Sequence, residues 1–185
     1  MRVPFRLTTV VWLSLVFAAT VFAAAESIRT IAGNPVFKRA GVDGVRGNFY
    51  LLDTNHPFTA DGKLTHWEIY AETTNPVQLV IVRNTGGALV EVGRSPVETP
   101  TIGYNLFSLP RRRKIDVLAG DLVGAYTSAG ATISNSVDRS AAGTCFPNLY
   151  NSVWFSFTAD PVFTCSQDRH YSLRAFRRVL REDED

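Results

Sequence analysis

Apolar and polar residues alternate with a period of two along much of the chain, which is the pattern of strands with one buried face. The clearest stretch is 63–71, where His66 and Glu68 would face away from the apolar side. That apolar side would carry every second residue, namely Thr65, Trp67, Ile69 and Ala71. Residues 77–83 are apolar on both faces, which indicates a central strand covered on both sides. Long helical periodicity is nearly absent, so the sequence predicts an all-β protein.

Turn-forming residues divide the chain into about eight or nine expected strands. These are 48–52, 63–71, 77–83, 88–92, 102–109, 115–118, 122–127, 150–158 and 170–179. Asn84-Thr85-Gly86-Gly87 would close a hairpin, and Ala119-Gly120-Asp121 would form a second tight turn. Leu173, Phe176 and Leu180 also fit a helical stripe, so a terminal helix is the alternative for the last segment.

Strands that each have one face to bury are accommodated by two antiparallel sheets packed on each other. We therefore expect residues 26–180 to form a single antiparallel β-sandwich, a jelly roll or a related Greek key, with Phe107 and Leu109 pointing into its core. An immunoglobulin domain fits less well, because Trp67 precedes both cysteines. Residues 181–185 would form a charged tail.

The first 25 residues have the pattern of a secretory signal peptide. Arg2 and Arg6 give a basic start, residues 10–22 are almost wholly apolar, and Ala23-Ala24-Ala25 supplies small residues where a signal peptidase would cut. This pattern predicts a secreted, extracellular protein that begins near Glu26. The alternative is an uncleaved membrane anchor, since the apolar run approaches the about 20 residues that a spanning helix needs.

Charge is balanced outside this segment. The sequence has 19 Lys and Arg against 17 Asp and Glu, and removal of Arg2 and Arg6 leaves 17 of each, a formal net charge of zero. A nucleic-acid partner or a broadly anionic membrane would require a net basic field or a clear basic face. We therefore expect neither as a partner once the signal peptide has been cleaved.

Cys145 and Cys165 are the two cysteines of the chain. In the oxidising compartment that a secreted protein meets, an isolated pair most often forms one disulfide, which would stabilise the fold by roughly 3 kcal/mol. The residues beside them offer no further metal ligand and no histidine, so a metal-binding or nucleophilic role is not indicated. We expect one structural disulfide.

Three segments together resemble a family of extracellular jelly-roll domains. They are 58–64 leading into Trp67-Glu68-Ile69-Tyr70, then 77–83, and then 115–124. The last is similar to the polar-Gly-Asp-apolar turn near the end of C1q/TNF-like domains and many carbohydrate-binding sandwiches. The resemblance covers roughly residues 45–127 and implies recognition of glycans or proteins through loops or one sheet face. The strand spacing and the cysteine-bearing segment after Ser128 depart from C1q, so a trimeric, collagen-associated role does not follow.

Exposed aromatic rings would support glycan binding, because sugar rings stack on Trp and Tyr. The candidate rings are Tyr70, Tyr104, Tyr126, Tyr150 and Trp154. For each of them the alternative is a place in the core. The basic run Arg111, Arg112, Arg113 and Lys114 would attract sulfated or uronic polysaccharide, or anionic lipid; the alternative is an exposed loop or a strand edge protected by charge.

One loop gathers oxygen ligands suited to calcium. Asp53, Asn55 and Asp61 lie close together in the sequence, and oxygen atoms at such positions are what Ca²⁺ prefers. The EF-hand pattern is not met, because Leu64 occupies the twelfth position from Asp53. Asx turns explain the same residues without a metal, and we expect no other cofactor.

Catalytic motifs are not found. The sequence has no His-Glu-x-x-His pair and no Gly-x-Ser-x-Gly elbow. A secreted hydrolase that pairs two carboxylates, drawn from Asp53, Asp61, Glu68 and Glu72, remains an alternative. Our main expectation is a secreted, non-enzymatic recognition module that binds a glycan or another extracellular-matrix component, with an extracellular glycan or protein as its partner. The second alternative is a structural or adhesive coat or matrix protein that acts by self-association as a homo-oligomer.

Overall fold

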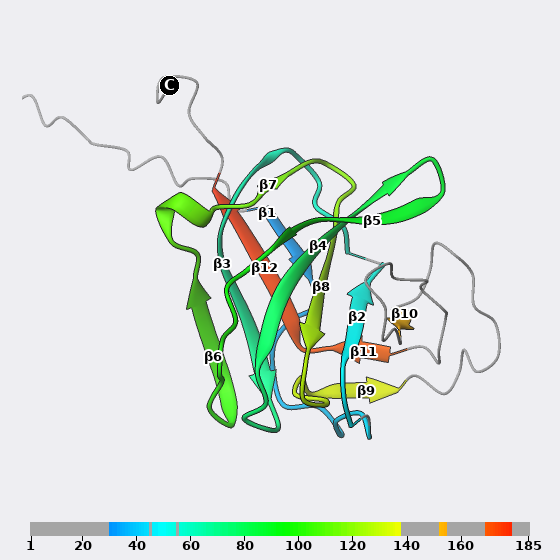
Figure 1. The fold of residues 1–185 in the computed structure, drawn as a ribbon, viewed down its shortest axis with the longest axis vertical. Coiled ribbons are helices and arrows are strands. Elements are labelled where there is room, and N and C mark those ends of the chain that lie inside the picture. Colours follow the sequence, from blue (N-terminus) through cyan, green and yellow to red (C-terminus); the bar gives the residue numbers. More distant parts are fainter. Residues whose placement is uncertain (1–29, 45, 55, 138–151, 155–168, 179–185) are drawn as a thin grey trace, which may run out of the picture.

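The computed structural model describes residues 30–44, 46–54, 56–137, 152–154 and 169–178 (Figure 1). In this part of the chain there are twelve β-strands and one 3₁₀ turn, η1 (Arg111–Arg113). All the strand pairs are antiparallel. The all-β prediction is therefore confirmed, and none of the described residues belongs to a helix that could cross a membrane.

The strands form two five-stranded sheets and one two-stranded sheet. The first sheet has the order β1 (Thr30–Gly33), β12 (Leu173–Arg178), β3 (Gly62–Ala71) and β6 (Gly103–Ser108), with β7 (Asp116–Val117) also paired to β3. The second has the order β10 (Ser152–Trp154), β2 (Phe49–Asp53), β8 (Leu122–Thr127), β4 (Val77–Thr85) and β5 (Ala88–Arg94). β11 (Arg169–Tyr171) and β9 (Asn135–Val137) make the small sheet.

Most of these strands lie where the period-two pattern predicts them, and β8 has the predicted bounds. The count is twelve instead of eight or nine for two reasons. β1 and β9 are four and three residues long, too short to show a pattern. The last predicted strand is divided at Ser172, where the chain passes from pairing with β9 to pairing with β1 and β3.

The terminal helix that the sequence left as an alternative is not formed over residues 173–178. This segment is strand β12, hydrogen-bonded to β1 on one side and to β3 on the other. Its apolar residues satisfy both periodicities over so short a length, and pairing on two sides decides in favour of the strand. The predicted strand 150–158 is described only at β10, and the predicted tail 181–185 lies outside the described residues.

One cluster of buried apolar side chains draws on both five-stranded sheets. Trp67 and Ile69 of β3 belong to it together with Leu79 and Ile81 of β4. Phe107 packs on this cluster from β6, with its ring 4.5 Å from that of Trp67, and Leu109 is buried, as the alternation predicted. Burial of these side chains away from water is the main source of stability for the arrangement.

The second sheet also has three buried apolar side chains on its other face. Leu52, Val80 and Val82 form a separate buried cluster, because they alternate with the residues that point into the main core. β4 thus has apolar side chains buried on both faces and lies between β8 and β5, which confirms the prediction of a central strand.

A buried aspartate holds the turn before β8. The Asp121 carboxylate accepts two hydrogen bonds of 2.7 Å from the Arg83 guanidinium and a third, also 2.7 Å, from the backbone N–H of Leu118. Gly120 has a φ of +90°, a conformation that glycine adopts without strain. The predicted tight turn is confirmed, and its conformation is linked to β4 through a charge-assisted pair.

Replacement Asp121→Asn should therefore lower the free energy of unfolding by about 1–3 kcal/mol, since it weakens three hydrogen bonds to a carboxylate that is only 1% exposed. Chemical denaturation would measure this loss. The matched control is Asp116→Asn. The Asp116 side chain is 77% exposed, and its carboxylate forms a long, exposed ion pair of 3.8 Å with Lys63, so the expected loss of stability is below about 0.5 kcal/mol. Equal losses in the two variants would contradict the role given to Asp121.

A second prediction concerns the close approach of β2 to β8. A Cβ placed on Gly124 would lie 2.3 Å from the carbonyl oxygen of Leu51, and backbone atoms in a paired strand do not move away easily. Gly124→Ala should cost about 1–3 kcal/mol of stability through overpacking. Gly44→Ala, where no atom lies within 4 Å of the added Cβ, is the control and should unfold close to the wild type.

Candidate functional site

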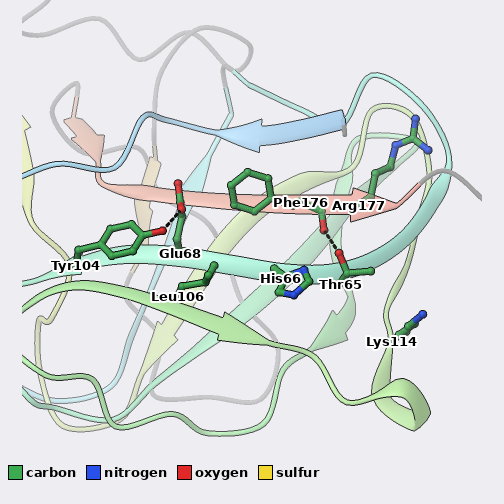
Figure 2. A pocket seen from close by; sticks show the side chains of 8 residues that line it. All are labelled: Thr65, His66, Glu68, Tyr104, Leu106, Lys114, Phe176 and Arg177. Atoms are coloured by element: carbon green, nitrogen blue, oxygen red, sulfur yellow. Dashed lines mark hydrogen bonds between the residues drawn. The ribbon is translucent and has the colours of Figure 1, made fainter. Parts of the chain in front are cut away.

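The face of the first sheet that points away from the main core carries a groove of about 480 Å³ (Figure 2). We call it the β3 groove. Its described lining comes from β3, β6, β12 and the segment after η1: Thr65, His66, Glu68, Tyr104, Leu106, Lys114, Phe176 and Arg177. Tyr104 and Glu68 lie at one end, and Lys114 and Arg177 lie at the other (Figure 2).

Strand register explains why these residues meet. Because Trp67 and Ile69 are buried in the core, the alternate residues His66 and Glu68 must face outward. The backbone of Glu68 is opposite Leu106 of β6 and Arg174 of β12. Residues from three strands that are distant in sequence therefore share one surface.

Thr65 does not lie on the core face, where simple alternation placed it. The pairing of β3 with β12 shifts between Phe176 and Arg177, so that His66 is opposite Phe176 and Leu64 is opposite Arg177. Thr65 is the extra residue of this bulge, and a bulge turns its strand locally. As a result Leu64 is buried, while Thr65 is half-buried and lines the groove.

The Glu68 carboxylate is only 3% exposed and is held on two sides. The Tyr104 hydroxyl donates a 2.6 Å hydrogen bond to its Oε2, and Nε of Arg174 donates a 2.6 Å hydrogen bond to its Oε1. The hydrogen bond to Glu68, followed by partial burial, raises the pKa of Tyr104 above its ordinary value. These contacts fix the Tyr104 ring in place while leaving the residue 56% exposed.

The described lining of the groove contains one carboxylate, Glu68, together with aromatic and basic side chains. Both oxygens of this carboxylate already accept strong hydrogen bonds. The alternative of two paired carboxylates would require a second acid in this lining. What the groove presents instead are ring faces, the exposed His66 imidazole and the Lys114 ammonium group.

The structure separates the aromatic residues that the sequence suggested as ligands. Tyr104 lines the groove, and Tyr70 is half-buried on the neighbouring strand, opposite Tyr104. Tyr126 belongs to β8, in the other large sheet. The backbone of Trp154 pairs with that of Tyr50 on β2. Tyr150 and the side chain of Trp154 lie outside the described residues.

Tyr126 is part of a packed cation–aromatic cluster. Its ring centre lies 4.7 Å from that of Tyr50, and the Arg94 guanidinium lies 4.6 Å above it. Arg94 also donates two hydrogen bonds, of 2.7 and 2.6 Å, to the Glu91 carboxylate, and these raise its pKa further. The ring of Tyr126 is thus already stacked by protein groups, which favours the structural alternative for this residue.

The basic run lies directly beside the groove. Arg111, Arg112 and Arg113 form η1 after β6 and are exposed (Figure 1). Lys114 is half-buried and lines the groove. Of the residues proposed from sequence, the fold therefore brings together Tyr104, Lys114 and the arginine run.

The residues suggested as calcium ligands make separate protein contacts. Asp53 is buried and accepts a 2.8 Å hydrogen bond from Nδ2 of Asn34 and a 3.0 Å hydrogen bond from the backbone of His56. Asp61 accepts a 2.8 Å hydrogen bond from the N–H of Ala119, and Asn55 lies outside the described residues. Among the residues that are described, no three His, Cys, Asp or Glu gather as metal ligands would.

Other predicted features also fall outside the described ranges. These are the signal peptide 1–25 and the cysteines Cys145 and Cys165. Comparison with protein-family models, with curated proteins and with solved structures gave no match to the chain.

Sequence reasoning did not select Leu106, Phe176 or Arg174 as site residues. The outward position of His66 and Glu68 was readable from alternation, and His66 is exposed as expected for a solvent-facing residue. The pairing of β12 with β3 could not be predicted from the sequence pattern, because Arg174 and Glu68 are 106 residues apart in the chain. Only the pairing of the strands reveals that they share a surface.

The Tyr104–Glu68 hydrogen bond gives a prediction for titration. A phenol that donates to a carboxylate should ionise above its usual pKa of about 10. Because the folded-state pKa of Tyr104 is raised, its hydrogen bond to Glu68 stabilises the folded protein below about pH 10. This contribution to the free energy of unfolding is lost as the pH rises through the folded-state pKa. Ultraviolet absorbance of the wild type minus that of Tyr104→Phe isolates this group. Glu68→Gln should return the transition toward pH 10; a wild-type transition already at pH 10 would contradict the assignment.

Proposed function

We propose that this protein is a secreted, non-enzymatic recognition module that binds a glycan in the β3 groove. The observation that carries the proposal is the Tyr104 ring, exposed at the groove and held in place by its hydrogen bond to Glu68. A ring that is fixed before binding loses little conformational freedom when a sugar stacks on it.

The remaining lining suits a sugar ring, which has both apolar and hydroxyl-bearing surfaces. Leu106 is 55% exposed and Phe176 is half-buried, so both offer carbon surface to the C–H groups of a sugar. His66 and Lys114 offer hydrogen-bonding groups for hydroxyl or acidic substituents. A few polar groups around an apolar surface is the usual composition of a ligand site.

The proposal extends to the fold class and the location. The two large sheets sharing one apolar core support a jelly-roll or related Greek-key β-sandwich. Cleavage after residue 25, an extracellular location and a disulfide between Cys145 and Cys165 follow from the sequence pattern. Calcium, if it contributes, would be bound in the loop of Asp53, Asn55 and Asp61.

A second candidate function is self-association as a coat or matrix component. It is favoured by exposed apolar side chains that concentrate between β5 and β6, where Val97 is 61% and Ile102 is 70% exposed. β6 is also an edge strand, and an edge can pair with a second copy. Such a protein would assemble in a concentration-dependent way without any glycan.

The first experiment is a glycan array with the full chain produced through a secretory route, screened with and without calcium. We expect selective binding that Tyr104→Ala weakens by about 1 kcal/mol, or roughly fivefold, because a stacked ring is lost. Ile102→Ala removes a still more exposed apolar group from outside the groove and should bind as the wild type does.

Two results would contradict the proposed function. Folded protein that binds no glycan but assembles with rising concentration in analytical ultracentrifugation would favour the coat protein. Cleavage of a bound glycan, detected by mass spectrometry of the array ligands in solution, would instead favour the hydrolase.

A further inference from the structure

Charge is distributed unequally along the β3 groove. At the Tyr104 end, the Glu68 carboxylate is neutralised by its ion pair with Arg174. At the opposite end lie Lys114 and Arg177 (Figure 2), and the exposed arginines of η1 directly precede Lys114 in the chain. A ligand lying in the groove would thus extend from a nearly neutral aromatic end to a cationic one.

The arginines of η1 and Lys114 are accessible to a ligand. In the described part of the chain, no carboxylate lies within ion-pairing distance, 4 Å, of Arg111, Arg112, Arg113 or Lys114. Elsewhere the arginines of the large sheets are engaged, as in the pairs Arg83–Asp121 and Arg94–Glu91. A cluster of four positive charges with no ion pair to the described residues attracts an anionic partner without first breaking such a pair.

A second hollow lies on the other side of Lys114. It has a volume of about 430 Å³, and its lining includes Arg94, Arg113 and Lys114. Lys114 lines both the β3 groove and this second hollow, so the two are neighbours at that residue. A long chain with repeated binding groups would fill both, whereas a single sugar would fill only part of one.

We infer that the ligand is an anionic polysaccharide, carrying sulfate or uronate groups, that lies in the β3 groove with its charged substituents at Lys114 and the η1 arginines. This inference rests on the proposed function and specifies its ligand class. Asp116 also lines the second hollow and pairs with Lys63, so we place the charged substituents on the side of Lys114 and Arg113.

Polysaccharide is favoured over the other polyanions by the surface between the charges and the ring. Leu106, His66 and Phe176 form a concave lining with both apolar and hydrogen-bonding groups, as a sugar chain requires. A nucleic acid would need a more extended basic surface than the arginines of η1 and Lys114 provide. A lipid surface is flat and would not enter a groove.

The test measures binding of the full chain, again produced through a secretory route, to immobilised heparin and to polygalacturonate. Chemically desulfated heparin is the reference with less charge, and dextran is the neutral reference. A single-stranded oligothymidylate and phosphatidylserine vesicles represent the other polyanions. We expect heparin or polygalacturonate to bind at least tenfold more tightly than dextran, and binding to weaken as salt is raised because screening shortens the range of the attraction.

Two double variants remove the same amount of charge from different places. R113Q/K114Q takes two cations that line the second hollow, one of which also lines the β3 groove, and should weaken binding to the anionic polysaccharide by about fivefold. K38Q/R46Q takes two exposed cations that line neither hollow and should change it less than about twofold. Circular dichroism would show that both variants remain folded.

The outcomes separate the two proposals. Binding of neutral glycans that Tyr104→Ala weakens, with no preference for heparin or polygalacturonate, would overturn this inference and leave the proposed function standing. Absence of binding to any glycan would overturn both. Equal losses in R113Q/K114Q and K38Q/R46Q, or binding of the oligothymidylate or the vesicles as tightly as heparin, would also overturn the assignment to a polysaccharide in the groove.

Discussion

Burial of the inner face of β3 is the constraint on which the rest of the structure depends. Trp67, Ile69 and Ala71 are completely buried, and they fix which side of the strand faces the core. A slip of one residue in pairing would move every side chain of a strand to the opposite face. The outward position of His66 and Glu68, and therefore the groove itself, follows from the requirement to keep an indole ring away from water.

Charged hydrogen bonds then hold elements together where the apolar core does not reach. Glu68 joins three strands of one sheet through its contacts with Tyr104 and Arg174. Asp121 does the same for a turn, since it ties the backbone at Leu118 to Arg83 of β4. In both cases a buried carboxylate accepts from an arginine and from a second donor, which compensates for its removal from water.

Period-two alternation was sufficient to predict the all-β class, the central position of 77–83 and most strands of the two large sheets. It failed at Thr65, because a bulge interrupts the period, and at β1 and β9, because three or four residues carry too little pattern. In the site, Tyr104 and Lys114 were identified from residue type alone. Phe176 and Arg174 were not, since their position depends on long-range pairing that no local pattern encodes.

The basic run at η1 is anchored to the sheet by buried residues on either side of it, and the charged residues themselves are not part of the core. Leu109 and Ile115, on either side of it, are buried, and each makes a 2.8 Å backbone hydrogen bond to β3, through Thr65 and Leu64. Between these two anchors, none of the three arginines of η1 is buried. Mutation can therefore change the charge of this short exposed segment while the core below keeps its packing.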